Sequence, residues 1–389
     1  MAQRSMQRNL KQESRTAVMG QDAPAEQARL QAMVQPLTVW FRENQRNLPW
    51  RQEPTPYHVW LSEIMLQQTR VEAVIPYYLR FLERLPDIAS LAVVDEEELM
   101  KLWQGLGYYN RARNLKKAAE QAVLEYGGEL PGDYEKLLKL PGIGSYTAGA
   151  IASIAFGIAR PAVDGNVLRV ISRILGSMED ISQAKVKKKI EEQLLLVMPE
   201  NAPGDFNQAL MELGATVCVP NGAPRCEECP VAEICLAFRE GKTDVIPYKA
   251  PKKPRRIEER TILLVKWKDE YAIEKRPSTG LLAGLYEFPN LEGSLNGEQL
   301  ADYLIHAGET SFTAEPLPSS KHVFSHVEWR MTAYHIVLRK KKSERFQFYK
   351  RQDILEHYAI PSAFSAYTEI LNGDHESNTL KGTRSCLAE

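Results

Sequence analysis

Long hydrophobic runs are missing from this sequence of 389 residues. The longest weakly polar stretch, Thr147 to Ala159, contains two glycines and is too short to cross a bilayer. No N-terminal segment joins a basic start to an apolar core of signal-peptide length. These absences argue against a membrane protein and a secreted protein, so we expect a cytoplasmic protein that does not bind a membrane.

A strong excess of positive charge is also missing. Lys and Arg number 49 against 50 Asp and Glu, which gives a formal net charge of −1, whereas nucleic-acid-binding domains are usually basic. Positive charge is concentrated locally at Lys249 to Arg260 and at Lys185 to Lys189. These runs can create a local positive field, or they can be a solvated linker and a solvated helix face. Composition alone therefore does not decide whether the chain binds nucleic acid.

Cysteine is scarce, with five in the chain. Structural disulfides are rare in a reducing cytoplasm, so a cysteine cluster there indicates metal binding or catalysis. Four cysteines lie within eighteen residues, and only one pair has Cys-x-x-Cys spacing: Cys218, Cys226, Cys229 and Cys235. Structural zinc sites more often carry two such pairs, whereas a single compact array also suits an iron–sulfur cluster. Cys386 lies in a polar tail and is not expected to be a ligand.

The length of the chain is sufficient for two domains of ordinary size. Hydrophobic residues make up 44% of it, which supports globular structure. The polar segments 1–27 and 372–389 lack apolar periodicity and are expected to be disordered tails. Between them we predict a helical domain at 28–245, a proline-containing linker at 246–257 and a smaller α+β domain at 258–371.

The spacing of apolar residues predicts helices in the first domain and strands in the second. The expected helices cover 28–48, 57–71, 71–84, 96–100, 109–125, 133–140, 147–158, 185–197 and 206–217. The expected strands cover 261–267, 271–273, 331–338 and 346–349.

A tight hairpin is predicted at Leu140 to Gly144, between two of these helices. Pro141 ends the first helix, while Gly142 and Gly144 permit a positive φ and leave room for a close neighbour. The amides at the start of the next helix, together with the helix dipole, would form a phosphate site. The alternative is an ordinary tight turn, because glycine marks turns in proteins of every class.

Polar side chains on the expected helix 57–71 form a candidate site. Glu63, Gln67 and Arg70 recur at i, i+4 and i+7 and would share one face of that helix. A glutamate on a helix is usually solvated, so its position alone does not identify a function. Tyr108, in a glycine-containing segment, can fill a core or stack in an opened nucleic-acid site.

Several segments together resemble the MutY-type adenine DNA glycosylases, a branch of the helix-hairpin-helix DNA glycosylase family. These segments are Trp60 to Val71, Gly105 to Arg111, the hairpin, and the Asp164 that follows it. Arg276 to Pro289 and Phe324 to Trp329 resemble the family's C-terminal domain, which is Nudix-like and recognises oxidised guanine. The resemblance implies a mainly α helix-hairpin-helix region with an iron–sulfur loop, followed by an α+β Nudix-like domain.

The resemblance implies a DNA repair enzyme that hydrolyses the N-glycosidic bond of adenine opposite 8-oxoguanine or guanine and leaves an abasic site. By resemblance, Glu63 is the catalytic acid, and Asp164 stays ionised to stabilise or transiently attack the sugar. Tyr146 and Asn166 would line the pocket and orient the reacting groups. Glycoside hydrolysis requires such an acid and anion, and the base has to leave the stack first. The implied DNA contacts are Arg51, Leu66, Gln68, Thr69, Tyr108, Gly142, Gly144, Ser325 and His326.

The resemblance also implies a [4Fe–4S] cluster on Cys218, Cys226, Cys229 and Cys235, with zinc as the alternative. The family usually separates these cysteines by six, two and five residues, and this chain separates them by seven, two and five. The extra residue falls in the segment 219–225. The C-terminal domain lacks the Arg-Glu-x-x-Glu-Glu string that holds divalent cations in a Nudix hydrolase, so we expect no hydrolysis there.

Two other functions fit part of the pattern. An endonuclease III-like glycosylase/lyase for oxidised pyrimidines shares the hairpin, the aspartate and the cysteines. It normally carries a lysine where this chain has Tyr146, and it lacks the C-terminal domain. A noncatalytic DNA-binding scaffold would not need both Glu63 and Asp164. We therefore expect a monofunctional glycosylase that acts on duplex DNA as a monomer.

Overall fold

The structure is a computed structural model that describes residues 23–251, 254–339 and 343–372. Contacts divide the chain into two units. The helical unit consists of Met1–Val93 and Asn114–Pro251, and the sheet unit consists of Val94–Arg113 and Lys252–Glu389. The grouping of 94–113 with the C-terminal residues was not expected, and the domain bounds taken from the sequence stay a prediction.

The tails expected at 1–27 and 372–389, together with Cys386, lie outside the described residues except at 23–27 and 372. Residues 23–27 belong to helix α2 (Ala23–Asn44), which begins before the expected start at Ala28. Within the described ranges, no helix is both long enough and apolar enough to span a membrane.

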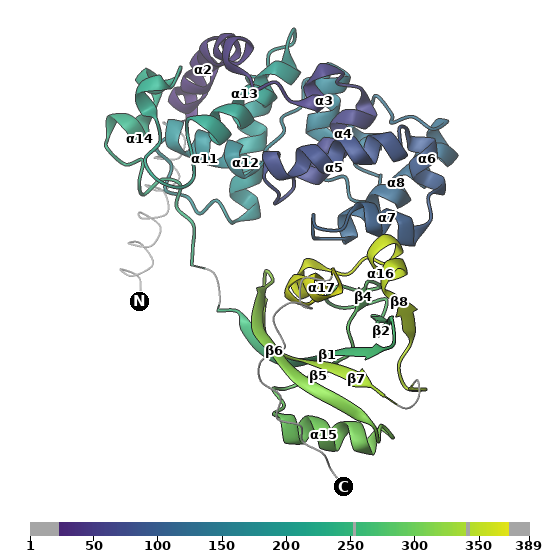
Figure 1. The fold of residues 1–389 in the computed structure, drawn as a ribbon. Coiled ribbons are helices and arrows are strands. Elements are labelled where there is room, and N and C mark those ends of the chain that lie inside the picture. The colour runs from purple at the N-terminus through teal and green to yellow at the C-terminus, as the bar shows by residue number, and fades with distance from the viewer. Residues whose placement is uncertain (1–22, 252–253, 340–342, 373–389) are drawn as a thin grey trace, which may run out of the picture. The chain divides into compact units, whose positions relative to one another are not determined.

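Helices build the helical unit, as expected (Figure 1). After α2 they are α3 (Pro49–Gln52), α4 (Pro56–Leu66), α5 (Val71–Arg84), α6 (Ile88–Val93), α8 (Asn110–Tyr126), α9 (Tyr134–Leu137), α10 (Ser145–Ala150), α11 (Gly165–Ile174), α12 (Ala184–Leu195), α13 (Pro203–Thr216) and α14 (Leu236–Arg239). Helix α8 begins in the sheet unit and continues into the helical unit.

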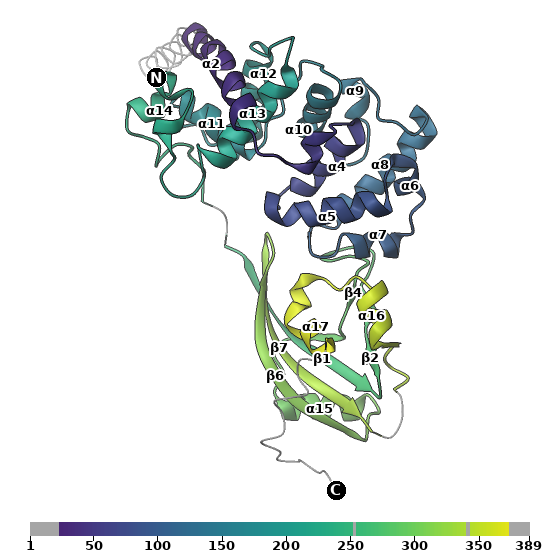
Figure 2. The ribbon, with the colours of Figure 1, turned by 45° about the horizontal axis from the view of Figure 1, so that its top comes forward.

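The core that supports the site lies among α2, α11, α12 and α13 (Figure 2). Leu30, Met33, Leu37 and Phe41 recur every three or four residues along α2 and are fully buried. They pack with the apolar faces of α11, α12 and α13 in one cluster. This packing fixes α11 and α13 side by side, so the polar residues of both helices can reach the same cavity.

The predicted hairpin joins α9 to α10. Asp133 caps α9 by accepting a hydrogen bond from the Lys136 amide at 2.9 Å. Gly142 has a φ of +77°, in the left-handed region that glycine permits, whereas Gly144 has a φ of −95° and does not use this freedom. Gly144 instead precedes α10 in an extended conformation that other residues can also adopt.

The helix expected at 147–158 is interrupted. Helix α10 ends at Ala150, and a π-helical turn follows at Ile151–Ala155. At Gly149, a Cβ atom would lie 2.1 Å from the carbonyl oxygen of Pro161. The small residues of this segment therefore allow it to pack directly against the backbone that leads to Asp164.

A six-stranded mixed sheet forms the centre of the sheet unit in its described residues. Its strands are β1 (Arg256–Trp267), β2 (Glu270–Ala272), β5 (Asn290–Glu292), β6 (Phe312–Val323), β7 (Val327–Leu338) and β8 (Phe348–Lys350). The order is β6-β7-β1-β2-β8, with β5 paired to β1, and β1 runs parallel to β7. Strands β3 (Glu274–Lys275) and β4 (Tyr286–Glu287) form a separate pair.

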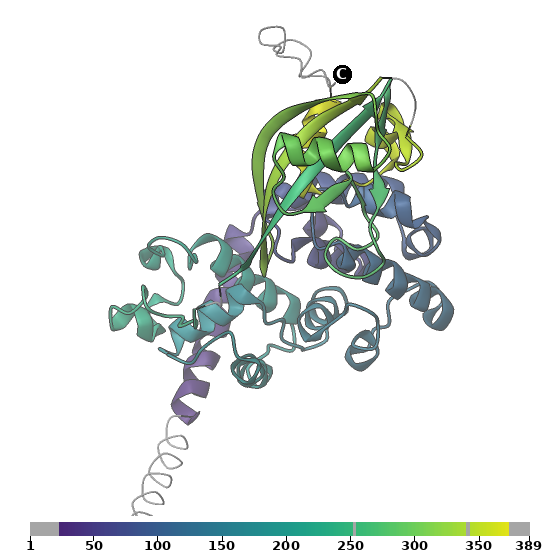
Figure 3. The ribbon, with the colours of Figure 1, turned by 90° about the horizontal axis from the view of Figure 1, so that it is seen from below.

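Helices cover both faces of this sheet (Figure 1). On β1, Leu263 and Val265 face α15 (Gly297–His306), the green helix that lies across the strands in Figure 3. Ile262 and Leu264 face the opposite cluster, which includes residues of α16 (Arg351–His357) and α17 (Ser365–Leu371). Because successive side chains of a strand alternate between faces, one apolar strand serves both cores. Helix α7 (Glu96–Leu102) also belongs to this unit.

Candidate active site

A pocket of about 620 Å³ opens in the helical unit. Its volume lies within the range of roughly 300–1,000 Å³ that ligand sites usually have. It collects every site residue predicted for the helical unit apart from the cysteines: Arg51, Glu63, Leu66, Gln68, Thr69, Gly142, Gly144, Tyr146, Asp164 and Asn166. These residues come from segments far apart in the sequence, so their meeting reflects the tertiary fold.

Glu63 lies on α4 and is 6% exposed. The helix begins at Pro56 after Thr55, whose side chain accepts a hydrogen bond from the His58 amide at 3.2 Å. The Tyr146 hydroxyl donates a hydrogen bond to a carboxylate oxygen of Glu63. Burial raises the pKa of Glu63 to about 7, with the nearby Asp164 adding to this, while the Tyr146 hydrogen bond and the Arg51 charge oppose it. Glu63 therefore exchanges a proton near neutral pH.

Asp164 is the N-cap of α11. One carboxylate oxygen accepts from the Val167 amide at 2.8 Å, and the other accepts from the Asn166 side-chain amide at 2.7 Å. Burial raises the pKa of Asp164, while these hydrogen bonds and the charge of Arg169 act in the opposite direction. The helix N-terminus also favours a negative charge at this position. Two carboxyl groups of one pocket thus have different surroundings.

Arg169 connects the Asp164 region to the cysteine segment. Its guanidinium donates to the Asn166 side-chain oxygen, to the Gly214 carbonyl oxygen and to the Cys218 carbonyl oxygen, each at 2.8 Å. Asn166 in turn donates to Asp164. A continuous set of hydrogen bonds therefore runs from the backbone of Cys218 to the carboxylate.

The four predicted ligand cysteines line a second, smaller and mainly apolar pocket: Cys218, Cys226, Cys229 and Cys235. None of the four forms a disulfide with another described cysteine, and no three of the described His, Cys, Asp and Glu side chains are grouped closely enough to hold a single metal ion. Arg173 donates to the Cys218 sulfur at 3.2 Å. Burial raises the pKa of Cys229 to about 12, so a bound metal would be needed to keep this thiol ionised.

Sequence comparisons match the HhH-GPD superfamily of base excision DNA repair proteins at residues 61–195 and a NUDIX domain at residues 261–369. The adenine DNA glycosylase of Mus musculus is 33% identical over 410 residues, which cover 90% of this chain and 79% of that protein. The adenine DNA glycosylase of Rattus norvegicus is 35% identical over 362 residues, which cover 78% of this chain and 70% of that protein. The chain belongs to the adenine DNA glycosylase family.

This glycosylase also resembles the solved structure of a thermostable thymine-DNA glycosylase, with a TM-score of 0.50 and 28% sequence identity. That similarity covers 55% of this chain and 98% of the other. The predicted fold class, an N-terminal helix-hairpin-helix region with a C-terminal Nudix-like domain, is confirmed. The enzyme class is confirmed as well: it is a DNA glycosylase of base excision repair, which hydrolyses N-glycosyl bonds.

The shared helical face predicted for Glu63, Gln67 and Arg70 was wrong. Helix α4 ends at Leu66, because the backbone leaves the helical conformation at Gln67, which has a ψ of 111°, and Gln68 then adopts a left-handed conformation with a φ of +59°. Arg70 starts the next helix as its N-cap and is not among the pocket-lining residues. Positive φ values are uncommon for residues other than glycine and tend to occur at functional sites. Gln68 thus remains a candidate contact because of its backbone and its place in the pocket wall.

The glycosylase pocket contains residues that the sequence reasoning missed. Helix α13 contributes Gln208, Met211 and Glu212, and Arg46 follows α2. The Met211 sulfur lies 3.4 Å from the Tyr146 hydroxyl oxygen. The available signal was the i, i+3, i+4 spacing of the three α13 residues, with a charged Glu212 on a mostly apolar helix.

The remaining predicted contacts lie in the sheet unit. Tyr108 has a φ of +48°, and its hydroxyl is 3.0 Å from the Ser325 hydroxyl. Ser325 and His326 are exposed in the turn between β6 and β7. The His326 carbonyl accepts a hydrogen bond from the Arg256 amide at 3.1 Å, which closes this turn onto β1. DNA contact by Tyr108, Ser325 and His326 stays a prediction.

Proposed function

We propose that this glycosylase releases adenine paired with 8-oxoguanine, or with guanine, from duplex DNA and leaves an intact strand with an abasic site. The observation that carries the proposal is the pair Glu63 and Asp164, which line one pocket in unlike surroundings. Enzymes that break glycosidic bonds use one carboxyl group as an acid and another as an anion. The adenine would enter the pocket after leaving the base stack.

Glu63 acts as the general acid. With a pKa of about 7, a large fraction of its carboxyl groups carry a proton at neutral pH. That proton passes to a ring nitrogen of adenine, and the base then leaves as a neutral molecule while the carbon–nitrogen bond breaks. Burial raises the pKa of Tyr146 far above its ordinary value, so its hydroxyl stays protonated and orients the Glu63 carboxyl group.

Asp164 is the anion of the pair. Hydrogen bonds from Val167 and Asn166 hold its two oxygens in a fixed orientation. A fixed carboxylate stabilises the positive charge that develops on the sugar as the bond breaks, or bonds to the anomeric carbon for a short time. Water then adds to that carbon and completes the hydrolysis.

The proposal assigns no strand cleavage to this enzyme. Cleavage by a lyase requires an amine that forms an imine with the sugar, and Tyr146 occupies the place where the lyase relatives carry lysine. A phenol cannot form an imine. The product is therefore an abasic strand that breaks only after treatment with alkali or heat.

Recognition of 8-oxoguanine is assigned to the sheet unit. The match of residues 261–369 to a NUDIX domain supports this, because the family's Nudix-like domain reads the oxidised guanine. Ser325 and His326 are exposed, and Tyr108 contacts Ser325. The cytoplasmic location and the monomeric state expected from the sequence stay predictions.

A [4Fe–4S] cluster is proposed for the pocket of Cys218, Cys226, Cys229 and Cys235. The four thiols line one pocket, and thiolates are the ligands that hold iron–sulfur clusters in proteins. Zinc is the alternative metal for such a set of thiols. Bound iron and sulfide in anaerobically purified protein would support the assignment, and stoichiometric zinc without iron would contradict it.

The test of the function is single-turnover release of base from matched duplexes. They carry adenine opposite 8-oxoguanine, guanine or thymine, and an oxidised pyrimidine opposite guanine. We expect fast release of adenine opposite 8-oxoguanine, slower release opposite guanine, and none from the other two. Glu63→Gln should abolish release while DNA binding persists, and the surface control Glu192→Gln should behave as the wild type. Release of the oxidised pyrimidine alone would refute the proposal.

A further inference from the structure

One carboxylate in the pocket wall has no role in the chemistry described above. Glu212 lies on α13, and its side chain is 1% exposed. Burial alone would raise the pKa of Glu212, but hydrogen bonds and charges from Arg46 and Arg51 lower it below its ordinary value. The group is therefore a buried anion that is paired with two cations.

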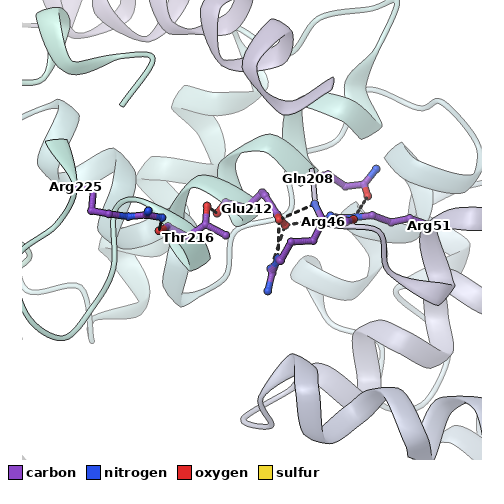
Figure 4. Close-up of polar contacts among 6 residues, drawn as sticks. All are labelled: Arg46, Arg51, Gln208, Glu212, Thr216 and Arg225. Atoms are coloured by element: carbon purple, nitrogen blue, oxygen red, sulfur yellow. Dashed lines mark hydrogen bonds and ion pairs between the residues drawn. The ribbon is translucent and has the colours of Figure 1, made fainter. Parts of the chain in front are cut away.

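The two arginines bind both oxygens of this carboxylate (Figure 4). Arg46 donates from Nε at 2.7 Å and from its backbone amide at 3.2 Å to one oxygen, and from a terminal nitrogen at 3.1 Å to the other. Arg51 donates to that second oxygen at 2.8 Å. A planar guanidinium held at several atoms has little freedom to rotate. Glu212 therefore fixes the orientation of Arg51.

Arg51 passes this constraint to Gln208, one turn before Glu212 on the same helix. Its Nε donates to the Gln208 side-chain oxygen at 3.1 Å, and a terminal nitrogen donates to the Arg46 carbonyl at 3.0 Å. A guanidinium can only donate hydrogen bonds, so the oxygen of the Gln208 amide must face Arg51. The NH₂ group of Gln208 is then left to serve as a donor in the pocket, which Gln208 lines.

We propose that Glu212 is a positioning residue that, through Arg51, makes Gln208 present a hydrogen-bond donor to the base in the pocket. A purine with an unprotonated ring nitrogen at that point, such as adenine, accepts this bond. A base that carries a ring N–H at that point cannot accept the bond, because its own N–H donor would face the NH₂ donor of Gln208, and such a base is disfavoured. Glu212 thus contributes to the choice of base without touching it. This inference rests on the proposed release of adenine.

The test uses adenine analogues that lack one ring acceptor. Duplexes carry adenine, 1-deazaadenine or 3-deazaadenine opposite 8-oxoguanine, and single-turnover release is measured with wild type and Gln208→Leu. For each analogue, we take the factor by which it slows release in the wild type and divide it by the same factor in Gln208→Leu. This ratio isolates the contact between Gln208 and the base, because the analogue's own reactivity cancels. We expect a ratio of roughly tenfold for one of the two analogues, the size of one net hydrogen bond.

In Glu212→Gln the ratio should fall close to one, although Gln208 itself is unchanged. Removal of one partner of a buried ion pair destabilises a protein, so this variant can fail to fold. Glu212→Asp keeps the charge but is too short to bridge both arginines, and its ratio should also fall. Thr216→Val is the matched control on α13, because its hydroxyl binds the Glu212 backbone oxygen at 2.8 Å and not the carboxylate. Its ratio should equal that of the wild type.

Wild-type ratios in folded Glu212 variants would overturn the proposal, as would ratios near one for both analogues in the wild type. Failure of the wild type to release adenine from any duplex is a different result, because it would refute the proposed function itself.

Discussion

Replacement of the buried acid should make the glycosylase inactive and, at alkaline pH, more stable. In the fold, burial raises the pKa of Glu63 from its ordinary value of 4.5 to about 7. Because the pKa in the folded state lies above that in the unfolded state, the proton stabilises the fold. This stabilisation is fully present below about pH 4.5 and is lost as the pH rises through about 7. The side chain of Gln in Glu63→Gln has no proton to lose, so the stability of this variant should lack this decrease with rising pH.

The size of the effect follows from the two pKa values. Their separation corresponds to roughly 3 kcal/mol, of which about 2 to 3 kcal/mol falls between pH 5 and pH 8. The amide oxygen of Gln can still accept the hydrogen bond from Tyr146, so little contact energy is lost. The free energy of unfolding of Glu63→Gln, relative to wild type, should therefore increase by about 2 to 3 kcal/mol from pH 5 to pH 8.

Urea unfolding of both proteins at the two pH values measures this difference, and the other titrating groups cancel in the comparison. Glu192→Gln on α12 is the control, because the Glu192 side chain is 68% exposed and surface ion pairs contribute little to stability. A relative stability of Glu63→Gln that is the same at pH 5 and pH 8 would refute the reasoning. It would mean that the fold does not hold this carboxyl group at a raised pKa, and the acid role would lose its physical basis.

Four further outcomes are expected. The single-turnover rate of wild-type adenine release should fall about tenfold per pH unit above about pH 7, as Glu63 ionises; a flat profile would exclude it as the acid. Tyr146→Lys should gain a borohydride-trappable complex with abasic DNA that the wild type lacks, and trapping by the wild type would show that another amine acts. Arg169→Met should slow release by roughly ten- to a hundredfold at unchanged DNA affinity, since Asn166 loses its anchor; unchanged release would make this hydrogen-bond network irrelevant to rate. Ser325→Ala should reduce the preference for 8-oxoguanine over guanine opposite adenine, and an unaltered preference would remove this hydroxyl from lesion reading.

The residues that sequence motifs selected lie together in the structure, but the motifs did not predict the conformation around them. Glu63, Tyr146 and Asp164 were assigned by resemblance, and they line one pocket. The end of α4 was missed because glutamine has no intrinsic preference for the left-handed backbone conformation that Gln68 adopts just after the helix. That conformation is held by the surrounding fold, which apolar spacing does not reveal.

In the sheet unit, too, some strands differ from those expected from the sequence. The strand expected at 261–267 is part of β1, which begins at Arg256, inside the segment 246–257 that was assigned to a proline-containing linker. Strand β6 was not predicted, since Pro316 and Pro318 lie within it. Proline is tolerated at the edge of a sheet, and β6 is the edge strand beside β7. Pairing with a neighbour thus overrides a local signal against strand formation.

The relay through Glu212 was beyond sequence reasoning for another reason. Glu212 lies 166 residues after Arg46 and 161 residues after Arg51, and each of the three alone looks like a solvated surface charge. Only the packing of α13 beside α2 brings the carboxylate within reach of both arginines. No regular spacing of residues in a sequence marks a buried ion pair.

The extra residue between the first two cysteines has a consequence for how such enzymes are recognised. The loop from Cys218 to Cys226 is closed at its base, where the Arg225 amide donates to the Val217 carbonyl at 3.0 Å. Residues 220–223, which include Gly222 at a φ of +78°, are exposed beyond this closure. Length can therefore vary at the tip while the two thiols keep their separation, since an added residue lengthens only the solvent-facing arc. A search that counts residues between cysteines would reject this chain, whereas a search that requires the closing hydrogen bond would accept it and would tolerate longer loops.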